Sequence, residues 1–376
     1  MSKKQKTEKR NKRSLGTVII FAIMICLLVS NAIIAISSYK VSEIELETSA
    51  YSNLYSIIDA AAMNISQINE TYFDTLEGLA AIPYFRDENN SLADKTEWLN
   101  EVGASSKLFK NMIFVDKSGN AMDDNGNVID DSKSTYFMAS RTGKRGILDP
   151  SNYNGQLSMI YSVPVYGYDK YVCGVIAGIV EGDALTKVVE NLSVGNGNSP
   201  FLINMSTGIV VADVNFANVE RQANVVKNTT GEMQLKLQDA AKGSRNATEV
   251  FFEGMGEMFM AYRPVGGSCP WAVVCYAPKA DFLGGLQTIL RVLFIVFGVS
   301  VVLAIIVGVS ITAKSIKPLK IVDKAFSEIA TGNADLTQQI AVRTDDEIGS
   351  VVIGFNQFAG KLQAIIKEIK GSESVL

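Results

Sequence analysis

The chain has 376 residues, of which 47% are hydrophobic, and its formal net charge at pH 7 is −4. It contains no histidine. A phospho-accepting histidine, a histidine metal site and a histidine-based catalytic dyad are therefore excluded within these residues. No nucleophile with a base, no glycine-rich phosphate loop and no metal-binding cluster is visible in the sequence, so we expect no cofactor, no metal and no enzyme activity.

Two apolar stretches, residues 15–36 and 289–311, each have roughly the twenty residues that a helix needs to cross a bilayer. The first follows a basic segment, residues 1–14, as a signal peptide would, but its apolar run is too long and no cleavage site is convincing. We interpret it as an uncleaved membrane anchor.

Lysine and arginine predict the orientation. They crowd residues 1–14, and further lysines follow the second apolar stretch at Lys314, Lys317, Lys320 and Lys324. Both termini are therefore expected in the cytoplasm and residues 37–285 outside the cell membrane. The basic tail is expected to face the lipid bilayer, and no nucleic-acid partner is expected.

The outer region begins with a long helix. Apolar residues recur close to the helical period over residues 39–80, and Ile82-Pro83 should end this helix. A second helix is expected over residues 95–109, with turns at 116–120 and 123–126. Strands are expected at residues 112–115, 157–165, 172–180, 201–204, 209–212, 248–252, 258–264 and 271–277.

An apolar strand followed by a polar turn that glycine closes occurs twice. Phe114-Val115-Asp116-Lys117-Ser118-Gly119-Asn120 parallels Leu202-Ile203-Asn204-Met205-Ser206-Thr207-Gly208, which indicates a duplicated module. With Tyr136-Phe137, Ser162-Val163-Pro164-Val165-Tyr166 and Cys269-Pro270-Trp271, the region resembles a double Cache sensor domain. The resemblance implies an α+β fold: two PAS-like antiparallel-sheet modules on a long N-terminal helix, the first and membrane-distal one at about residues 110–185 and the second at about 195–280.

The resemblance also implies a ligand in the first module, under the loop before Tyr136. In amino-acid-binding members an arginine or lysine and a tryptophan precede this tyrosine, and a later aspartate holds the ammonium. Here Lys133 supplies the cation, but Thr135 occupies the position of the tryptophan, and Ile179 and Val180 occupy the position of the aspartate. Glu181 is expected to point to the opposite strand face. Burying an ammonium without an anion costs several kcal/mol, so we expect an organic acid or another polar metabolite rather than an amino acid.

Six residues are expected to form this site: Lys133, Tyr136, Asp149, Tyr153 and Tyr161 line it, and Asp131 orients the loop. The alternative is that Lys133 and Asp131 are solvated loop charges and that the tyrosines belong to the sheet core. The second module is expected to be a structural spacer, with Asp213 and Asn215 beside a shallow pocket.

Three cysteines are expected outside the membrane. Cys269 and Cys275 are six residues apart on one predicted strand, too far for an easy bridge, and Cys173 is distant in sequence. Buried apolar thiols are the expected state, and a disulfide between any two of them is the alternative.

Two amphipathic helices follow the second apolar stretch. The first carries Leu319, Val322, Phe326 and Ile329, and the second carries a seam of Ile348, Val352, Phe355, Ala359, Leu362, Ile366 and Ile369. Such seams are buried only against other helices. Pro318 lies in the first turn of the first helix, where no hydrogen bond is lost. Gly332 and Asn333 should end this helix, and Asp345 or Asp346 should begin the second.

Residues 313–366 resemble a HAMP domain. The resemblance rests on Pro318, the connector from Gly332 to Thr337 with Asp335 and Leu336, then Asp346-Glu347-Ile348-Gly349, and Phe355-Asn356. It implies a homodimer, because two such helices from each of two chains make a parallel four-helix bundle. An ordinary juxtamembrane coiled coil is the alternative.

Residues 367–376 are expected to be the start of a signalling helix. The stretch 361–370 is similar to the helix that leads into the signalling hairpin of methyl-accepting chemotaxis proteins, so the chain resembles the input half of a chemoreceptor without that hairpin. A chemotaxis kinase and adaptor would then act only through a cytoplasmic region outside these residues. Two alternatives remain: the sensor half of a membrane histidine kinase or diguanylate cyclase, and a surface enzyme on a membrane anchor.

Overall fold

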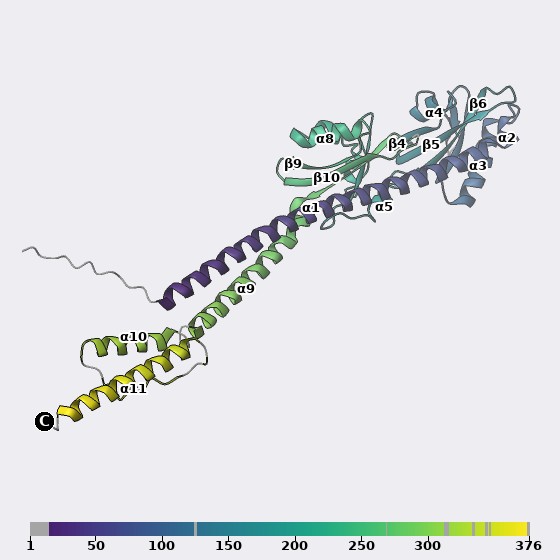
Figure 1. The fold of residues 1–376 in the computed structure, drawn as a ribbon. Helices are drawn as coiled ribbons and strands as arrows, with labels where there is room; N and C mark the ends of the chain where they lie inside the picture. The colour runs from purple at the N-terminus through teal and green to yellow at the C-terminus, as the bar shows by residue number, and fades with distance from the viewer. Residues whose placement is uncertain are drawn as a thin grey trace, which may run out of the picture. The chain divides into compact units, whose positions relative to one another are not determined.

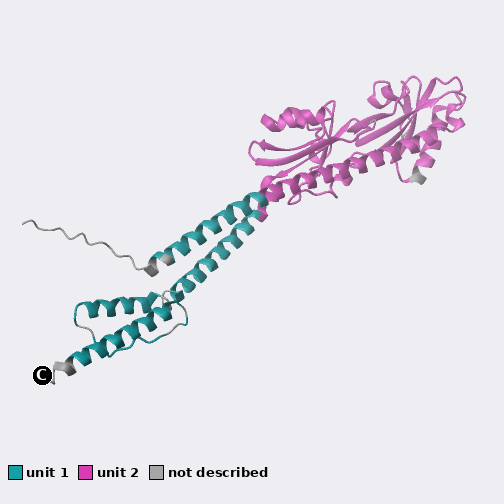
Figure 2. Cartoon of the chain, viewed as in Figure 1, with its two compact units in different colours: residues 1–42, 286–376 teal, residues 43–285 magenta. Residues whose placement is uncertain are grey.

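The computed structural model describes residues 15–123, 126–267, 269–311, 316–332, 335–342, 345 and 347–373. The chain forms two compact units (Figure 2). One contains Glu43–Gly285, and the other contains Met1–Ser42 together with Leu286–Leu376. We describe each unit by itself.

The larger unit begins on α1 (Leu15–Ala80), which ends next to the predicted Ile82-Pro83 boundary. Pro83 starts the short helix α2 (Pro83–Arg86), where its missing N–H leaves no bond unmade. The helix α3 (Leu92–Ser106) is capped by Ser91, whose hydroxyl accepts a hydrogen bond from the Asp94 N–H at 3.1 Å. It lies three residues earlier in the chain than predicted.

The first sheet has the strand order β1-β6-β5-β4 and is antiparallel throughout. Its strands are β1 (Asn111–Asp116), β4 (Gly146–Tyr153), β5 (Gln156–Tyr166) and β6 (Val172–Glu181). A separate hairpin pairs β2 (Asn120–Met122) with β3 (Val128–Asp130), and the helix α4 (Thr135–Ser140) follows it. The strands β2, β3 and β4 and the helix α4 were not predicted from the sequence.

The second sheet has the order β8-β7-β11-β10-β9. Its strands are β7 (Phe201–Asn204), β8 (Val210–Ala212), β9 (Asn246–Phe252), β10 (Gly256–Pro264) and β11 (Trp271–Pro278). The connections hold the helices α5 (Thr186–Val189), α6 (Ala217–Glu220), α7 (Val225–Asn228) and α8 (Gly231–Ala241).

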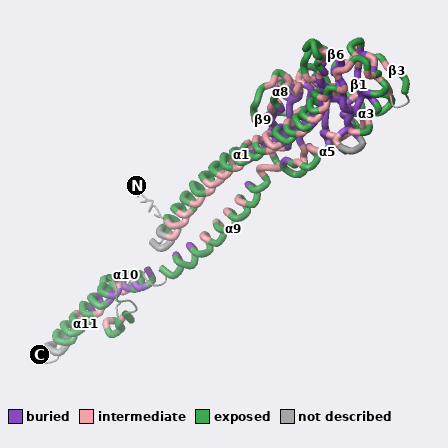
Figure 3. The backbone as a smooth tube through the Cα atoms, turned by 90° about the vertical axis from the view of Figure 1, so that its right-hand side faces the viewer, coloured by how far each residue is buried: buried purple, intermediate pink, exposed green. Residues whose placement is uncertain are grey.

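Both sheets are covered on two faces. Figure 3 shows that buried residues are concentrated in this unit. One face of each sheet packs on α1, where Leu54 and Phe73 join Tyr161 of β5 and Phe259 of β10 in one core. The opposite face of the first sheet is covered by Tyr136 and other residues around α4. The opposite face of the second sheet is covered by α8 through Met233, Leu237 and Ala240. The two sheets lie one after the other along α1 (Figure 1).

The two modules share a turn. After β1, the Asp116 carboxylate accepts a hydrogen bond from the Ser118 N–H at 2.8 Å, and after β7 the Asn204 side chain accepts one from the Ser206 N–H at 2.8 Å. Gly119 and Gly208 close these turns at φ of 95° and 75°, which favours glycine. The sequence parallel between the modules therefore corresponds to equivalent Asx turns.

The smaller unit contains the first part of α1 and most of α9 (Lys279–Ile311). In the described residues, two helices have the length and composition needed to cross a membrane: Ile20–Ala80 and Lys279–Ile311. Asn31 of α1 donates a hydrogen bond to the Ser300 hydroxyl of α9 at 3.3 Å. Gly308 allows Ile20 to pack closely, because a Cβ there would lie 3.0 Å from the Ile20 side chain.

The helices α10 (Lys317–Ala330) and α11 (Glu347–Glu373) pack together in the same unit. Val322, Val352 and Phe355 are buried, and the Phe326 ring meets the Phe355 ring edge-on at 4.8 Å between centroids. Asn356 fixes the connector through two hydrogen bonds with the backbone of Ile340, at 2.9 and 2.8 Å. The predicted boundary residues Asn333 and Asp346 lie outside the described residues.

All four cysteines are unpaired. Cys275 is buried, Cys173 and Cys269 are half-buried, and Cys26 is exposed. Burial raises the pKa of the Cys269 and Cys275 thiols to about 12. They are therefore neutral at physiological pH, as expected of inert packed thiols.

Candidate ligand-binding site

A buried carboxylate organises the outer face of the first module. Asp131 accepts hydrogen bonds from the phenols of Tyr136 and Tyr153 at 2.5 and 2.8 Å, and from the Ser134 hydroxyl at 3.1 Å. Asp131 and Tyr136 are both buried. Three donors around one carboxylate stabilise its negative charge.

The chain reaches this arrangement through local backbone bonds. The Asp131 N–H donates to the Gly119 carbonyl at 2.8 Å, which ties the loop to the Asx turn after β1. The Ser134 N–H donates to the Asp131 carbonyl at 2.9 Å, just before α4 begins at Thr135. Gly146 then lets β4 pass close by, because a Cβ there would lie 2.3 Å from the Tyr136 carbonyl oxygen.

A cavity of about 80 Å³ adjoins this cluster through Tyr153. Its wall is formed by residues of the strands β1 to β6 and of the loops between them. The lining residues are Lys110, Asn111, Ile113, Met122, Asp123, Ile129, Tyr153, Asn154, Gln156, Ser158 and Ile179. The Lys110 ammonium donates to the Gln156 side-chain oxygen. The Asp123 carboxylate accepts from the Asn127 N–H at 2.7 Å. A cation and a carboxylate therefore stand in one small cavity.

Burial also sets the protonation of the cluster. Desolvation, together with the charges of Tyr153 and Asp131, raises the pKa of the Tyr136 phenol far above its usual value. Tyr136 therefore remains a hydrogen-bond donor across the physiological pH range.

The structure brings together three of the six predicted site residues, Asp131, Tyr136 and Tyr153. Lys133 is exposed on the loop and does not line the cavity. Tyr161 lies on the other face of the sheet, in the core against α1, and its phenol donates to the Asn69 side chain at 2.7 Å. Adjacent strand residues face opposite sides, so Ile160, not Tyr161, faces the cluster.

Asp149 lies between the two modules. A bulge interrupts the pairing of β4 with β5 between Leu148 and Ser151, and it directs the Asp149 carboxylate toward the second sheet. There it accepts hydrogen bonds from the Trp271 indole N–H at 2.8 Å and from the Asn204 amide at 2.6 Å. Asp149 therefore links the modules and does not line the cavity.

The pH dependence of stability should report this buried carboxylate. Desolvation raises the pKa of the Asp149 carboxyl group. The hydrogen bonds from Trp271 and Asn204 lower it, but by less, so the net shift is upward. The folded-state pKa lies above the unfolded value of about 3.9, so the folded protein binds this proton more tightly than the unfolded chain does. The resulting gain in stability is complete below the unfolded pKa and is lost as pH rises through the folded-state pKa. On acidification, the free energy of unfolding of the wild type should therefore rise relative to that of Asp149→Asn.

Urea unfolding of both proteins at several pH values from 7 down to about 4, the unfolded-state pKa, followed by tryptophan fluorescence, measures this difference. A difference that stays constant over this range would contradict a raised pKa at Asp149.

Lys110, Asp123 and Gln156 were not predicted as site residues. The available sequence signal was weak: Lys110-Asn111 directly precedes an apolar strand, and Asp123 lies in a predicted turn. Ile179 lines the cavity, and Glu181, two residues later, is on the same strand face, contrary to expectation. Glu181 pairs with Lys187 at 2.8 Å.

The predicted relay residues lie on α10, α11 and the connector. Pro318 is buried in the first turn of α10, and Phe355 is buried on α11. The Asp335 carboxylate accepts bonds from the Thr337 N–H and hydroxyl at 3.0 and 2.6 Å, beside half-buried Leu336. Of the three residues that begin α11, Glu347 is exposed, Ile348 half-buried and Gly349 buried.

The sequence of the larger unit matches a family model, described as Cache domain, over residues 42–286. The chain belongs to the Cache domain family. A second model, HAMP domain, matches residues 311–364, which include α10, the connector and most of α11. The Cache and HAMP resemblances and the α+β fold expected from the sequence are therefore confirmed.

Relatives of the chain include methyl-accepting chemotaxis protein McpA of Pseudomonas putida, which is 24% identical over 63% of this chain and 36% of its own length. The chain thus spans about a third of that relative.

Solved structures of similar fold include the ligand-binding domain of Mlp24 with asparagine and the extracellular domain of a protein described as a histidine kinase, mmHK1S-Z2. Both have a TM-score of 0.50 and 14% identity, and they cover 65% and 62% of this chain and 98% of their own chains. These likenesses concern the fold alone.

Proposed function

We propose that this chain is the sensing and relaying part of a transmembrane chemoreceptor that acts as a homodimer. The observation that supports it most is the order of parts: a Cache domain at residues 42–286 between two helices of membrane-spanning length, followed by a HAMP domain at 311–364. The relationship to methyl-accepting chemotaxis proteins favours a chemotaxis output.

In this proposal the Cache domain lies outside the cell membrane and both termini lie in the cytoplasm. The basic residues 1–14 and the lysines after residue 311 support this orientation. The proposed domain limits are residues 1–14, 15–36, 37–285, 289–311, 313–366 and 367–376, as expected from the sequence.

The proposed ligand is a small molecule with a carboxylate, amino acids included. Lys110 supplies a cation for the carboxylate, and Asp123 supplies the anionic partner for an ammonium that the sequence had seemed to lack. The expectation against amino acids therefore has no support, and the Mlp24 domain has been solved with asparagine. A cavity of about 80 Å³ holds two or three water volumes of about 30 Å³ each, which favours a ligand of few atoms.

The proposed relay runs from α9 into the helix pair. Ligand binding changes the equilibrium between two arrangements only by its differential affinity for them. The residues proposed to carry that change are Pro318, Asp335, Leu336, Glu347, Ile348, Gly349 and Phe355.

Replacing Lys110 tests the ligand site. In a screen of small organic acids and amino acids, a ligand raises the melting temperature of the full chain in lipid nanodiscs, followed by fluorescence of its two tryptophans. Lys110→Ala should weaken binding of a carboxylate by about tenfold or more, since a charge-assisted hydrogen bond is lost. Lys133→Ala is the matched control and should bind nearly as the wild type does. The opposite result, loss with Lys133→Ala alone, would move the site to the loop before Tyr136.

A histidine kinase input is the second candidate, because the mmHK1S-Z2 extracellular domain shares the fold. A chimera separates the two: residues 1–373 are joined to the signalling hairpin of a methyl-accepting chemotaxis protein. Ligand-dependent control of the chemotaxis kinase would support the chemoreceptor. A chimera that folds and binds but never controls the kinase would favour the other output.

A further inference from the structure

A second cavity, of about 280 Å³, lies in the Cache domain at the edge of the first sheet. It is lined by the last turn of α1, the residue Arg86 of α2, the segment before β4, and the end of β5, with Glu77, Ala80, Ala81, Arg86, Gly143, Arg145, Pro164 and Tyr166 on its wall. The cavity exists because β4 begins at Gly146 opposite Ser162 and leaves the last residues of β5 without a partner on that side. Pro164 suits such an edge. This cavity shares no lining residue with the one at Lys110.

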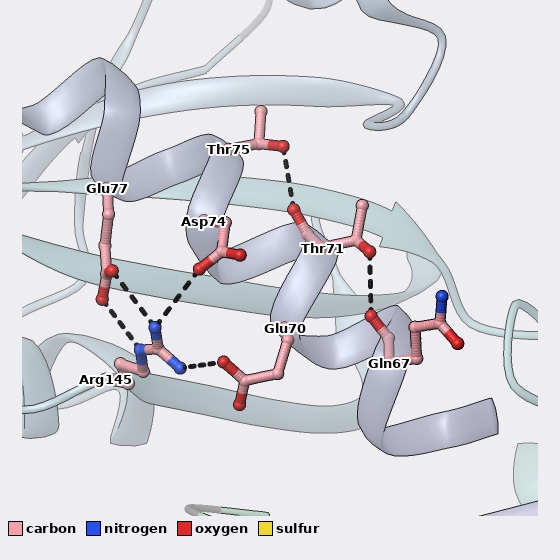
Figure 4. A network of polar contacts seen from close by, with 7 residues as sticks. All are labelled: Gln67, Glu70, Thr71, Asp74, Thr75, Glu77 and Arg145. Carbon is pink, nitrogen blue, oxygen red and sulfur yellow. Dashed lines mark hydrogen bonds and ion pairs between the residues drawn. The ribbon is translucent and has the colours of Figure 1, made fainter. Parts of the chain in front are cut away.

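The two arginines in this cavity differ in their partners. Arg145 is fully engaged by α1: its Nε lies 2.8 Å from Glu77, its Nη1 lies 2.6 Å from Glu70, and its Nη2 lies 3.6 Å from Asp74 (Figure 4). Its guanidinium also lies over the Phe73 ring at 4.8 Å. The three carboxylates of α1 are thereby committed to Arg145.

Arg86 has no such partner. Its Nε is buried, yet it makes no hydrogen bond, and no ion pair of Arg86 occurs within the described residues. An unmatched, buried N–H of a charged group lowers stability unless a ligand or water accepts from it. The planar fork of a guanidinium matches the two oxygens of a carboxylate. The Tyr166 hydroxyl on the same wall donates only a long bond of 3.4 Å, to the Gly143 carbonyl, and its single O–H can turn to a ligand acceptor instead.

We propose that this cavity is a binding site for a small carboxylate, held by Arg86 and assisted by Tyr166. A cation is disfavoured, because it would have to displace Arg145 from Glu70, Asp74 and Glu77. A singly charged carboxylate is favoured over a doubly charged phosphate, because the three α1 carboxylates outnumber Arg145 and Arg86, so each further negative charge on the ligand adds repulsion. A bound anion would connect α2 to β5 beside the end of α1. Because α1 also contains the first membrane-spanning stretch, binding here would act on that helix at a second place, separate from the Lys110 cavity.

Saturation-transfer NMR of acetate with the full chain in nanodiscs tests the site, at an ionic strength held constant with chloride. All variants carry Lys110→Ala, which removes the cation of the other cavity. The parent should give a saturable acetate signal. Arg86→Gln should weaken binding by about tenfold or more, and Arg86→Lys, which keeps the charge but not the fork, by a smaller factor. Arg141→Gln replaces an exposed arginine of the same module outside the cavity and should change nothing.

The proposed site would be overturned by no saturable acetate signal in the parent, by an unchanged signal in Arg86→Gln, or by an equal loss in Arg141→Gln. The melting temperature of each variant shows whether it is folded. If Arg86→Gln does not fold, Arg86→Lys still provides the test. If phosphate displaces acetate at equal concentration, the assignment to carboxylates is overturned. Because these variants leave the Lys110 cavity out of the measurement, the outcome is independent of the proposed ligand site.

Discussion

Replacing Trp271 with alanine is expected to lower the free energy of unfolding of the Cache domain by about 3–5 kcal/mol. Trp271 is 0% exposed and is the first residue of β11, where it pairs with Asn204 of β7. The substitution opens a large cavity in the core against α1. It also removes the indole N–H, which donates a hydrogen bond to the buried Asp149 carboxylate at 2.8 Å.

A phenylalanine variant separates the two contributions. Trp271→Phe keeps most of the apolar volume but leaves Asp149 with one donor fewer, so it should lower the free energy of unfolding by about 1–3 kcal/mol. Urea unfolding followed by circular dichroism measures both variants without relying on the lost fluorophore. Equal losses in the two variants would show that the hydrogen bond to Asp149, and not the packing, dominates.

This contact also bears on signalling. The strand β4 holds Tyr153 at the cavity and Asp149 at the second module, and β11 continues from Trp271 through Pro278 into α9. Trp271→Phe should therefore still bind ligand in the first module while transmitting less of the response to a chimeric output. A fully wild-type response would exclude this contact as a necessary connection.

The sequence predicted the fold well wherever apolar periodicity was regular. In β5, β6, β10 and β11 the buried runs are long and bounded by turn residues, so these strands were placed close to their observed limits. The strand β4 was missed because Pro150 and a bulge interrupt it. The helix α8 was also missed, although Met233, Leu237 and Ala240 have helical spacing.

The candidate site was less predictable, because its residues meet through strand pairing. Lys110 reaches Gln156 across 46 residues of sequence only because β1, β6 and β5 are neighbours. The face of Tyr161 depends on which side of the sheet α1 covers, and the sequence of β5 does not contain that information. By contrast, Asp131, Tyr136 and Tyr153 lie within one segment of the sequence, and the Asp131 carboxylate accepts hydrogen bonds from both tyrosines.

Replacing Asp131 with alanine is expected to lower the free energy of unfolding by about 2–4 kcal/mol, because the buried Tyr136 phenol loses its acceptor and cannot reach water. Tyr153 and Ser134 lose the same partner, so the wall of the cavity should loosen and ligand affinity should fall with stability. Asp130→Ala is the matched control: Asp130 is the preceding residue, is exposed, and should leave both quantities close to wild type.

A double-mutant cycle identifies the cause of that loss. If the stranded phenol is responsible, adding Tyr136→Phe to Asp131→Ala removes the unsatisfied hydroxyl, and the double variant should be more stable than the sum of the two single losses by about 1 kcal/mol or more. Urea unfolding of the four proteins gives this coupling free energy. Additive losses would mean that the phenol finds another acceptor once Asp131 is gone, and that the carboxylate acts on the loop through Ser134 and Tyr153 instead.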